Sequence, residues 1–180
     1  MIKIPIGTKT LLYGNHQFLL HPLFVGLAWT KYYHKLPNPK EAICIIIHDW
    51  GYWGKPNLDG EEGEQHPFWA AQWALNHFDK SKSPPLYNKS CYYLCLYHSS
   101  FLSKRLGIKV SRLCIPDKLG VIMMPIWLIV LLGKLTGETN EYRNCPKYAH
   151  NHRENMTDTE LYRKFREYYL TKIIPNLKED

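Results

Sequence analysis

The sequence predicts an all-α fold, a helical bundle that forms a single domain over residues 1–180. Three observations support this prediction: apolar residues recur at helical spacing, several segments begin with helix-capping residues, and alternating strand patterns are scarce. Apolar residues make up 45% of the chain and aromatic residues 14%, which is enough for a packed core and argues against disorder. A chain of this length also suits one domain.

The predicted helices follow one another between breaks rich in glycine and proline. The clearest start is at Asn38, where Pro39 and Glu41 follow in the pattern of a capping box, and this helix is expected to end near Gly51. Its centre, Ile43–Ile47, has the composition of a strand, but the capping start favours a helix. The other expected helices are Pro22–Lys35, Pro67–Phe78, Tyr87–Leu102, an apolar helix from about Asp117 onward, and a charged helix from Thr157 to Ile174.

The segment Leu119–Leu132 is uncharged and apolar. It is shorter than the roughly 20 apolar residues that a membrane span requires, and Pro125 interrupts it. We therefore expect a buried helix rather than a membrane anchor, with an exposed patch used for homo-oligomerisation as a variant. No secretory signal is visible near the first residue, and five cysteines without a CxxC pair indicate reduced thiols, so we expect a cytoplasmic protein.

The net charge is +7, from 23 lysines and arginines against 16 aspartates and glutamates. A basic excess fits an anionic partner, such as a small molecule that contains phosphate, a nucleic acid or an acidic membrane surface. The positive residues are scattered and form no run of five, so the charge selects none of these partners. A solvated surface is the simplest interpretation, and a nucleic acid is not favoured.

Histidines and aspartates gather at the edges of the predicted helices. His48 and Asp49 end a very apolar segment, where an ionised aspartate must be paired or bound to a metal to be tolerated. The negative end of the helix dipole at the same place favours a cation. Imidazole and carboxylate donors without a thiolate suit Mn, Fe, Co, Ni, Zn or Mg. The remaining candidates at helix edges are His21, His66, His98 and Asp117.

In this order the residues resemble the HD-domain superfamily of metal-dependent phosphohydrolases, whose pattern is H…HD…H…H…D on a bundle of helices. The resemblance covers roughly residues 16–135, with a C-terminal helical extension over about 157–174, and the segments IIIHDWGYWGKP and CIPDKLG strengthen it. It implies that four residues form the core ligand set of one cation: His21, His48, Asp49 and Asp117. His66 and His98 match the additional ligands of two-metal members, so one or two divalent ions are expected.

The resemblance also implies an activity, the hydrolysis of a phosphate ester of a nucleotide or a nucleotide-like small molecule. Water bound to a cation such as Zn²⁺ has its pKa lowered from roughly 15.7 to about 7, which supplies a hydroxide nucleophile near neutral pH. Asp49 is expected to bridge the ions and orient that nucleophile. The same ligands filled by two irons occur in HD-type oxygenases, so a di-iron oxygenase is the alternative. A binding module that has lost turnover is a third hypothesis.

Basic residues near this centre are candidates for binding the substrate. Lys55 lies on a glycine-containing loop six residues after Asp49, and a lysine after the HD pair often contacts phosphate in two-metal relatives. The acidic stretch Asp59–Glu64 could supply a proton donor, although a solvated loop is favoured. Weaker substrate-binding candidates are Lys118, Lys104 and Arg105. The histidines expected on the surface are His34, His77, His150 and His152.

Overall fold

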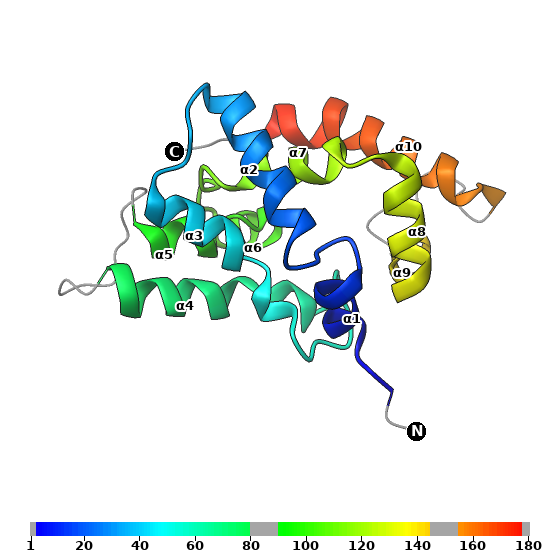
Figure 1. Ribbon diagram of the computed structural model, residues 1–180, viewed down its shortest axis with the longest axis horizontal. Coiled ribbons are helices and arrows are strands. Elements are labelled where there is room, and N and C mark those ends of the chain that lie inside the picture. Colours follow the sequence, from blue (N-terminus) through cyan, green and yellow to red (C-terminus); the bar gives the residue numbers. More distant parts are fainter. Residues whose placement is uncertain (1–2, 80–89, 145–154, 178–180) are drawn as a thin grey trace.

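The computed structural model describes residues 3–79, 90–144 and 155–177 and confirms the all-α fold (Figure 1). The α-helices in this part of the chain are α1 (Ile6–Tyr13), α2 (Leu20–Tyr33), α3 (Pro39–Ile47), α4 (Pro67–Phe78), α5 (Cys91–Leu96), α6 (Ser100–Leu106), α7 (Cys114–Met123), α8 (Ile126–Thr136), α9 (Glu138–Asn144) and α10 (Asp158–Tyr168). Short helical turns are η1 (Trp50–Tyr52), η2 (Gly63–Gln65), η5 (Tyr169–Ile173) and η6 (Ile174–Asn176).

The helices pack in two groups. In the first group α2 lies against α7, and α3, α4 and α5 pack on one another (Figure 1). The main core lies here, with Trp29, Cys44 and Ala71 fully buried. In the second group α1, α9 and α10 pack on α8, around a smaller core that contains Met124 and Ile129. The candidate ligands therefore come from helices whose relative positions are fixed by apolar contacts.

Two helices begin as their capping residues predict. The Asn38 side chain accepts hydrogen bonds from the backbone N–H groups of Lys40 and Glu41, and the Glu41 side chain accepts one from the Asn38 N–H. Thr157 caps α10 in the same way. The helix α3 ends at Ile47, earlier than expected, because the chain continues into the tighter turn η1.

The expected helix over Tyr87–Leu102 is two helices, α5 and α6, and its expected start lies outside the described residues. The break falls at Tyr97–Ser99, where the Ser99 side chain accepts a hydrogen bond from the Leu102 N–H and begins α6. His98 therefore lies in a turn between two helices.

The apolar segment is also two helices, not the single buried helix that the sequence predicts. Met124 is extended and α7 and α8 meet at 99°, because Pro125 lacks an N–H and disfavours helical geometry in the residue before it. One face of α8 is exposed, with Trp127 at 68% and Leu131 at 48%. Homo-oligomerisation through this segment stays a prediction. In the described part of the chain no single helix has the length and apolar character needed to cross a membrane.

Two described helices, α1 and α9, were not expected from the sequence. The helix α1 follows Pro5 without a side-chain cap, and α9 lies within a stretch expected to be a turn. The α9 residue Glu141 accepts hydrogen bonds from the backbone N–H groups of Leu58 and Asp59, at 2.5 and 3.2 Å. The helix thereby holds the loop that follows η1. The described cysteines, Cys44, Cys91, Cys95 and Cys114, are free and buried, whereas Cys145 lies outside the described residues.

Close packing of α2 on α7 depends on Gly120, where an added Cβ would lie 2.8 Å from Val25 Cγ2 and 2.9 Å from its backbone nitrogen. We predict that Gly120→Ala lowers the free energy of unfolding by about 1–3 kcal/mol, because the helices must separate. Gly26→Ala is the matched control: nothing lies within 4 Å of its added Cβ, so it should raise stability by about 0.5–1 kcal/mol. Urea unfolding measures both, and equal effects of the two substitutions would contradict the packing account.

Candidate metal centre

The structure brings all six predicted ligands to one place. His21 lies in the first turn of α2, His48 and Asp49 follow the end of α3, and the others lie at the start of α4, between α5 and α6, and in the first turn of α7. The side chains of His21, His48, Asp49, His66 and His98 are buried, and that of Asp117 is nearly so. Helix ends thus direct polar groups into the interior at a single point.

Four of these residues form a first donor group: His21, His48, Asp49 and Asp117. The Nε2 atom of His21 lies 3.1 Å from Oδ1 of Asp117 and 3.2 Å from Nε2 of His48. It also lies 3.1 Å from Oδ2 of Asp49. These separations allow each residue to offer one ligand atom to a common metal ion.

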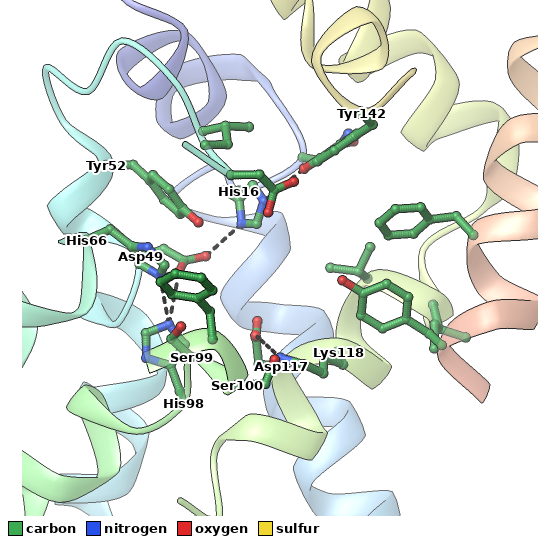
Figure 2. A pocket seen from close by; sticks show the side chains of 18 of the residues that line it. His16, Asp49, Tyr52, His66, His98, Ser99, Ser100, Asp117, Lys118 and Tyr142 are labelled. Carbon is green, nitrogen blue, oxygen red and sulfur yellow. Dashed lines mark hydrogen bonds and ion pairs between the residues drawn. The ribbon is translucent and has the colours of Figure 1, made fainter. Parts of the chain in front are cut away.

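Asp49, His66 and His98 form a second donor group (Figure 2). The Nε2 atoms of the two histidines are 3.0 Å apart, and each lies 3.4 Å from Oδ1 of Asp49. Asp49 therefore directs Oδ2 toward the first group and Oδ1 toward the second. A carboxylate in this position can bridge two metal ions.

Backbone carbonyl groups determine which ring nitrogen of three histidines faces the cluster. Nδ1 of His48 lies 2.7 Å from the Ile45 carbonyl oxygen, and Nδ1 of His66 lies 2.8 Å from that of Gly63. Nδ1 of His98 is bonded to the carbonyl oxygen of Cys95 in the same way. Because a carbonyl oxygen only accepts, each Nδ1 carries a hydrogen and donates it. In the neutral rings the Nε2 lone pairs then point into the cluster, as in histidines that bind metals.

The second donor group fits a cation because its lone pairs converge. When both rings are neutral, His66 and His98 present their Nε2 lone pairs to each other at 3.0 Å, and Asp49 Oδ1 adds a third acceptor. Three acceptors with no hydrogen among them repel one another, whereas a cation between them satisfies all three. The buried cluster could therefore hold metal, and it is compatible with an HD-type site.

Burial and the nearby carboxylates shift the pKa values of His66 and His48 in opposite directions. Burial lowers the pKa of His66 to about 3, although the charge of Asp49 opposes the shift. Burial also disfavours the charged form of His48, but Asp49 and Asp117 outweigh it and raise its pKa to about 10. The pKa values of the Asp49 and Asp117 carboxyl groups lie well below their ordinary value. Burial opposes their ionisation, but the nearby histidines outweigh it. Negative charge is thus concentrated at the point where the histidine nitrogens converge.

His16 is a further member of the centre and is not one of the six ligands that the resemblance implies. Its Nδ1 lies 2.8 Å from Oδ2 of Asp49, and its Nε2 lies 3.4 Å from the hydroxyl group of Tyr142 (Figure 2). Burial lowers the pKa of His16, but the charge and hydrogen bond of Asp49 raise it to about 9. His16 is thus placed to orient Asp49 from the side of the pocket.

Close packing also orients His66. The ring of Tyr52 stacks on the His66 imidazole, with centroids 3.9 Å apart and an interplanar angle of 16°. Gly51 permits this approach, because a Cβ there would lie 2.0 Å from the His66 carbonyl oxygen. The turn after Asp49 therefore fixes a ligand that lies 17 residues further along the chain.

A pocket of about 120 Å³ opens onto the centre. Asp49, His66, His98 and Asp117 line one part of it, and residues of α7, α8 and α10 line another. Lys118 also lines the pocket, with Nζ 3.8 Å from Oδ2 of Asp117 (Figure 2). Burial opposes the charge of Lys118, but Cys114 and Asp117 raise its pKa above the ordinary value.

The other predicted substrate contacts lie elsewhere. Lys55 is not among the residues that line this pocket, and its backbone carbonyl accepts a hydrogen bond from the Gly7 N–H. Lys104 is exposed on α6, and Arg105 lines a neighbouring hollow. In the acidic loop, Asp59 and Glu64 line the pocket while Glu61 and Glu62 are exposed. His34 and His77 are exposed, as predicted, and His150 and His152 lie outside the described residues.

Comparisons of the chain with protein-family models, with curated proteins and with solved structures found no match.

We predict that the protein binds two equivalents of Mn²⁺ and that each donor group holds one. His66→Ala should remove one equivalent, because it breaks the second group alone. Asp49→Ala should remove both, because Asp49 belongs to both groups. His77→Ala, at an exposed site on α4, is the control and should change nothing. Equilibrium dialysis with elemental analysis measures the stoichiometry, and an unchanged value for Asp49→Ala would rule out the shared ligand.

Proposed function

We propose that this protein is a metal-dependent phosphohydrolase of the HD type that cleaves the phosphate ester of a small molecule. The observation that carries the proposal is the shared carboxylate of Asp49, which lies between two donor groups made of histidine nitrogens and carboxylate oxygens. Two-metal centres of this kind recur in enzymes that transfer phosphoryl groups to water. The order of the ligands, H…HD…H…H…D, supports the same assignment.

When bound, divalent ions would supply Lewis acidity and lower the pKa of a coordinated water. The residues of the chain do the rest. His21, His48 and Asp117 would bind at one side of Asp49, and His66 and His98 at the other. The carbonyl groups behind the histidines fix the orientation of the rings, so little reorganisation is needed when a substrate arrives.

Lys118 is the residue best placed to contact the phosphate. It lines the pocket beside Asp117, is only 9% exposed, and carries a positive charge close to the Asp117 carboxylate. A phosphate group that enters the pocket would meet this charge in surroundings of low dielectric, where a hydrogen bond to an ion is strong. Lys118 would therefore hold the substrate while the ester bond breaks.

The reaction balances as a simple hydrolysis. Water forms a new bond to phosphorus, the bond between phosphorus and the ester oxygen breaks, and the departing oxygen takes up the proton that water loses. Inorganic phosphate or a phosphomonoester and an alcohol result, and no electron is transferred. The negative charge that develops on the phosphoryl oxygens meets the positive charge of Lys118.

The test is hydrolysis with Mn²⁺ or Co²⁺ under anaerobic conditions, measured as phosphate release from nucleotides and simple phosphomonoesters and by chromatography of the products from cyclic dinucleotides. Release without oxygen supports the phosphohydrolase. A di-iron oxygenase would use the same ligands, and oxygen consumption by iron-loaded protein without phosphate release would favour it instead.

For Asp49→Asn we predict a fall in kcat of more than about 10²-fold, because both donor groups lose an ionised oxygen. Circular dichroism should be unchanged, since the substitution keeps the shape of the side chain. Near-normal turnover in a folded variant would remove Asp49 from the mechanism.

For Lys118→Met we predict a rise in KM of at least about tenfold, because a hydrogen bond to a charged group contributes roughly 1.5–3 kcal/mol. Metal content should stay the same. Lys55→Met is the matched comparison, since Lys55 does not line the pocket but follows the HD pair in the sequence. A larger rise in KM in Lys55→Met than in Lys118→Met would indicate that Lys55, on the glycine-containing loop, contacts the phosphate instead.

A further inference from the structure

The pocket has two chemically different ends. At one end lie the donor groups around Asp49. At the other end the lining residues come from α7, α8, α10 and the turn after α10. The residues of these elements that follow Lys118 in the chain and line the pocket include no aspartate or glutamate. They are Val121, Ile122, Ile129, Tyr162, Phe165, Arg166 and Tyr169, and we call them the α10 wall.

The α10 wall is built around stacked rings. The rings of Phe165 and Tyr169 are 4.7 Å apart at an interplanar angle of 28°, and Tyr142 lies 5.5 Å from Phe165. The α7 residues Val121 and Ile122 line the same pocket with aliphatic side chains. Aromatic and aliphatic surfaces in one pocket favour a flat apolar group, because it can stack and leave water at the same time.

The position of α10 is fixed, so the wall is formed before a ligand binds. Asp158, at the start of α10, pairs with Arg143 at 2.7 Å and with Lys134 at 2.9 Å. One turn later the Tyr162 hydroxyl lies 3.2 Å from Thr139 Oγ1, and Arg166 is bonded to the Met124 carbonyl oxygen. A wall that is already ordered costs less free energy to fill than one that must be ordered on binding.

The size of the pocket limits what the wall can hold. Its volume of about 120 Å³ is smaller than the roughly 150 Å³ of an engineered apolar cavity that binds benzene. A substrate larger than one ring must therefore extend beyond it.

We propose that the alcohol part of the substrate carries an aromatic ring that lies against Phe165 and Tyr169, while its phosphate reaches Lys118 and the donor groups. This inference rests on the proposed function. The ring can belong to a simple aryl phosphate or to the base of a nucleotide, since both offer a flat π surface. The two sources differ in size and can be separated by experiment.

The test measures the binding of phosphonates, which are not hydrolysed, to the Mn²⁺-loaded full chain by calorimetry. We expect phenylphosphonate to bind about tenfold tighter than methylphosphonate. Phe165→Ala should weaken phenylphosphonate binding about five- to tenfold and leave methylphosphonate within twofold. Leu170→Ala is the matched control, because Leu170 is an exposed apolar residue of the adjoining turn that does not line the pocket. Tyr169→Leu keeps apolar volume and provides a second variant if Phe165→Ala does not fold.

The outcomes separate the two proposals. The ring subsite would be overturned if wild-type protein bound the two phosphonates with equal affinity, or if Phe165→Ala lost the same affinity for both. Either result would leave the phosphohydrolase proposal intact, provided that the protein still hydrolysed an ester. Failure to hydrolyse any phosphomonoester or phosphodiester would instead overturn the proposed function. A nucleoside phosphonate that binds tighter than phenylphosphonate, and depends on Phe165, would support the subsite and assign the ring to a base.

Discussion

The structure depends on a concentration of hydrogen-bond acceptors around one buried carboxylate. Both oxygens of Asp49 face imidazole nitrogens, and the carbonyl bonds of His66 and His98 turn their lone pairs toward it. Buried acceptors that lack hydrogens between them are costly unless a cation joins them. Apolar contacts already hold the helices that carry these residues together, but such contacts do not require six polar side chains to converge at one point. Their convergence is therefore best explained by a function at the centre.

The ends of the helices, rather than their faces, carry this chemistry. Side chains on the long faces form the apolar core, with Trp29 and Cys44 fully buried. Side chains at the ends, such as His48 after α3 and Asp117 in the first turn of α7, emerge where the backbone leaves the core. His16, in the loop that follows α1, contacts Asp49, and Tyr142 of α9 contacts His16 from the other side. The core and the site are thus built by different residues of the same helices.

Local signals in the sequence predicted much of this arrangement. The capping residues Asn38 and Thr157 determine where α3 and α10 begin, because they bond to the next turn of their own chain. The six candidate ligands were recognisable because they follow the order of a known pattern. Pro125 was visible as an interruption, yet the 99° bend was not, since a bend angle depends on what the two helices pack against.

Other features depend on contacts between distant parts of the chain and left no local signal. The helix α9 is polar, and Glu138 is buried only because it accepts hydrogen bonds from Asn15 and Thr136. The places of His16 and Tyr142 at the centre arise in the same way. Lys118 was a weaker candidate than Lys55 in the sequence, because burial beside Asp117 becomes visible only when α7 is packed.

The most direct test of the central claim is anomalous diffraction from crystals soaked in Mn²⁺. The account predicts two peaks, one between Asp49 Oδ2 and the first donor group and one between Asp49 Oδ1, His66 and His98. Crystals that bind Mn²⁺ elsewhere, with no anomalous peak beside Asp49, would contradict it.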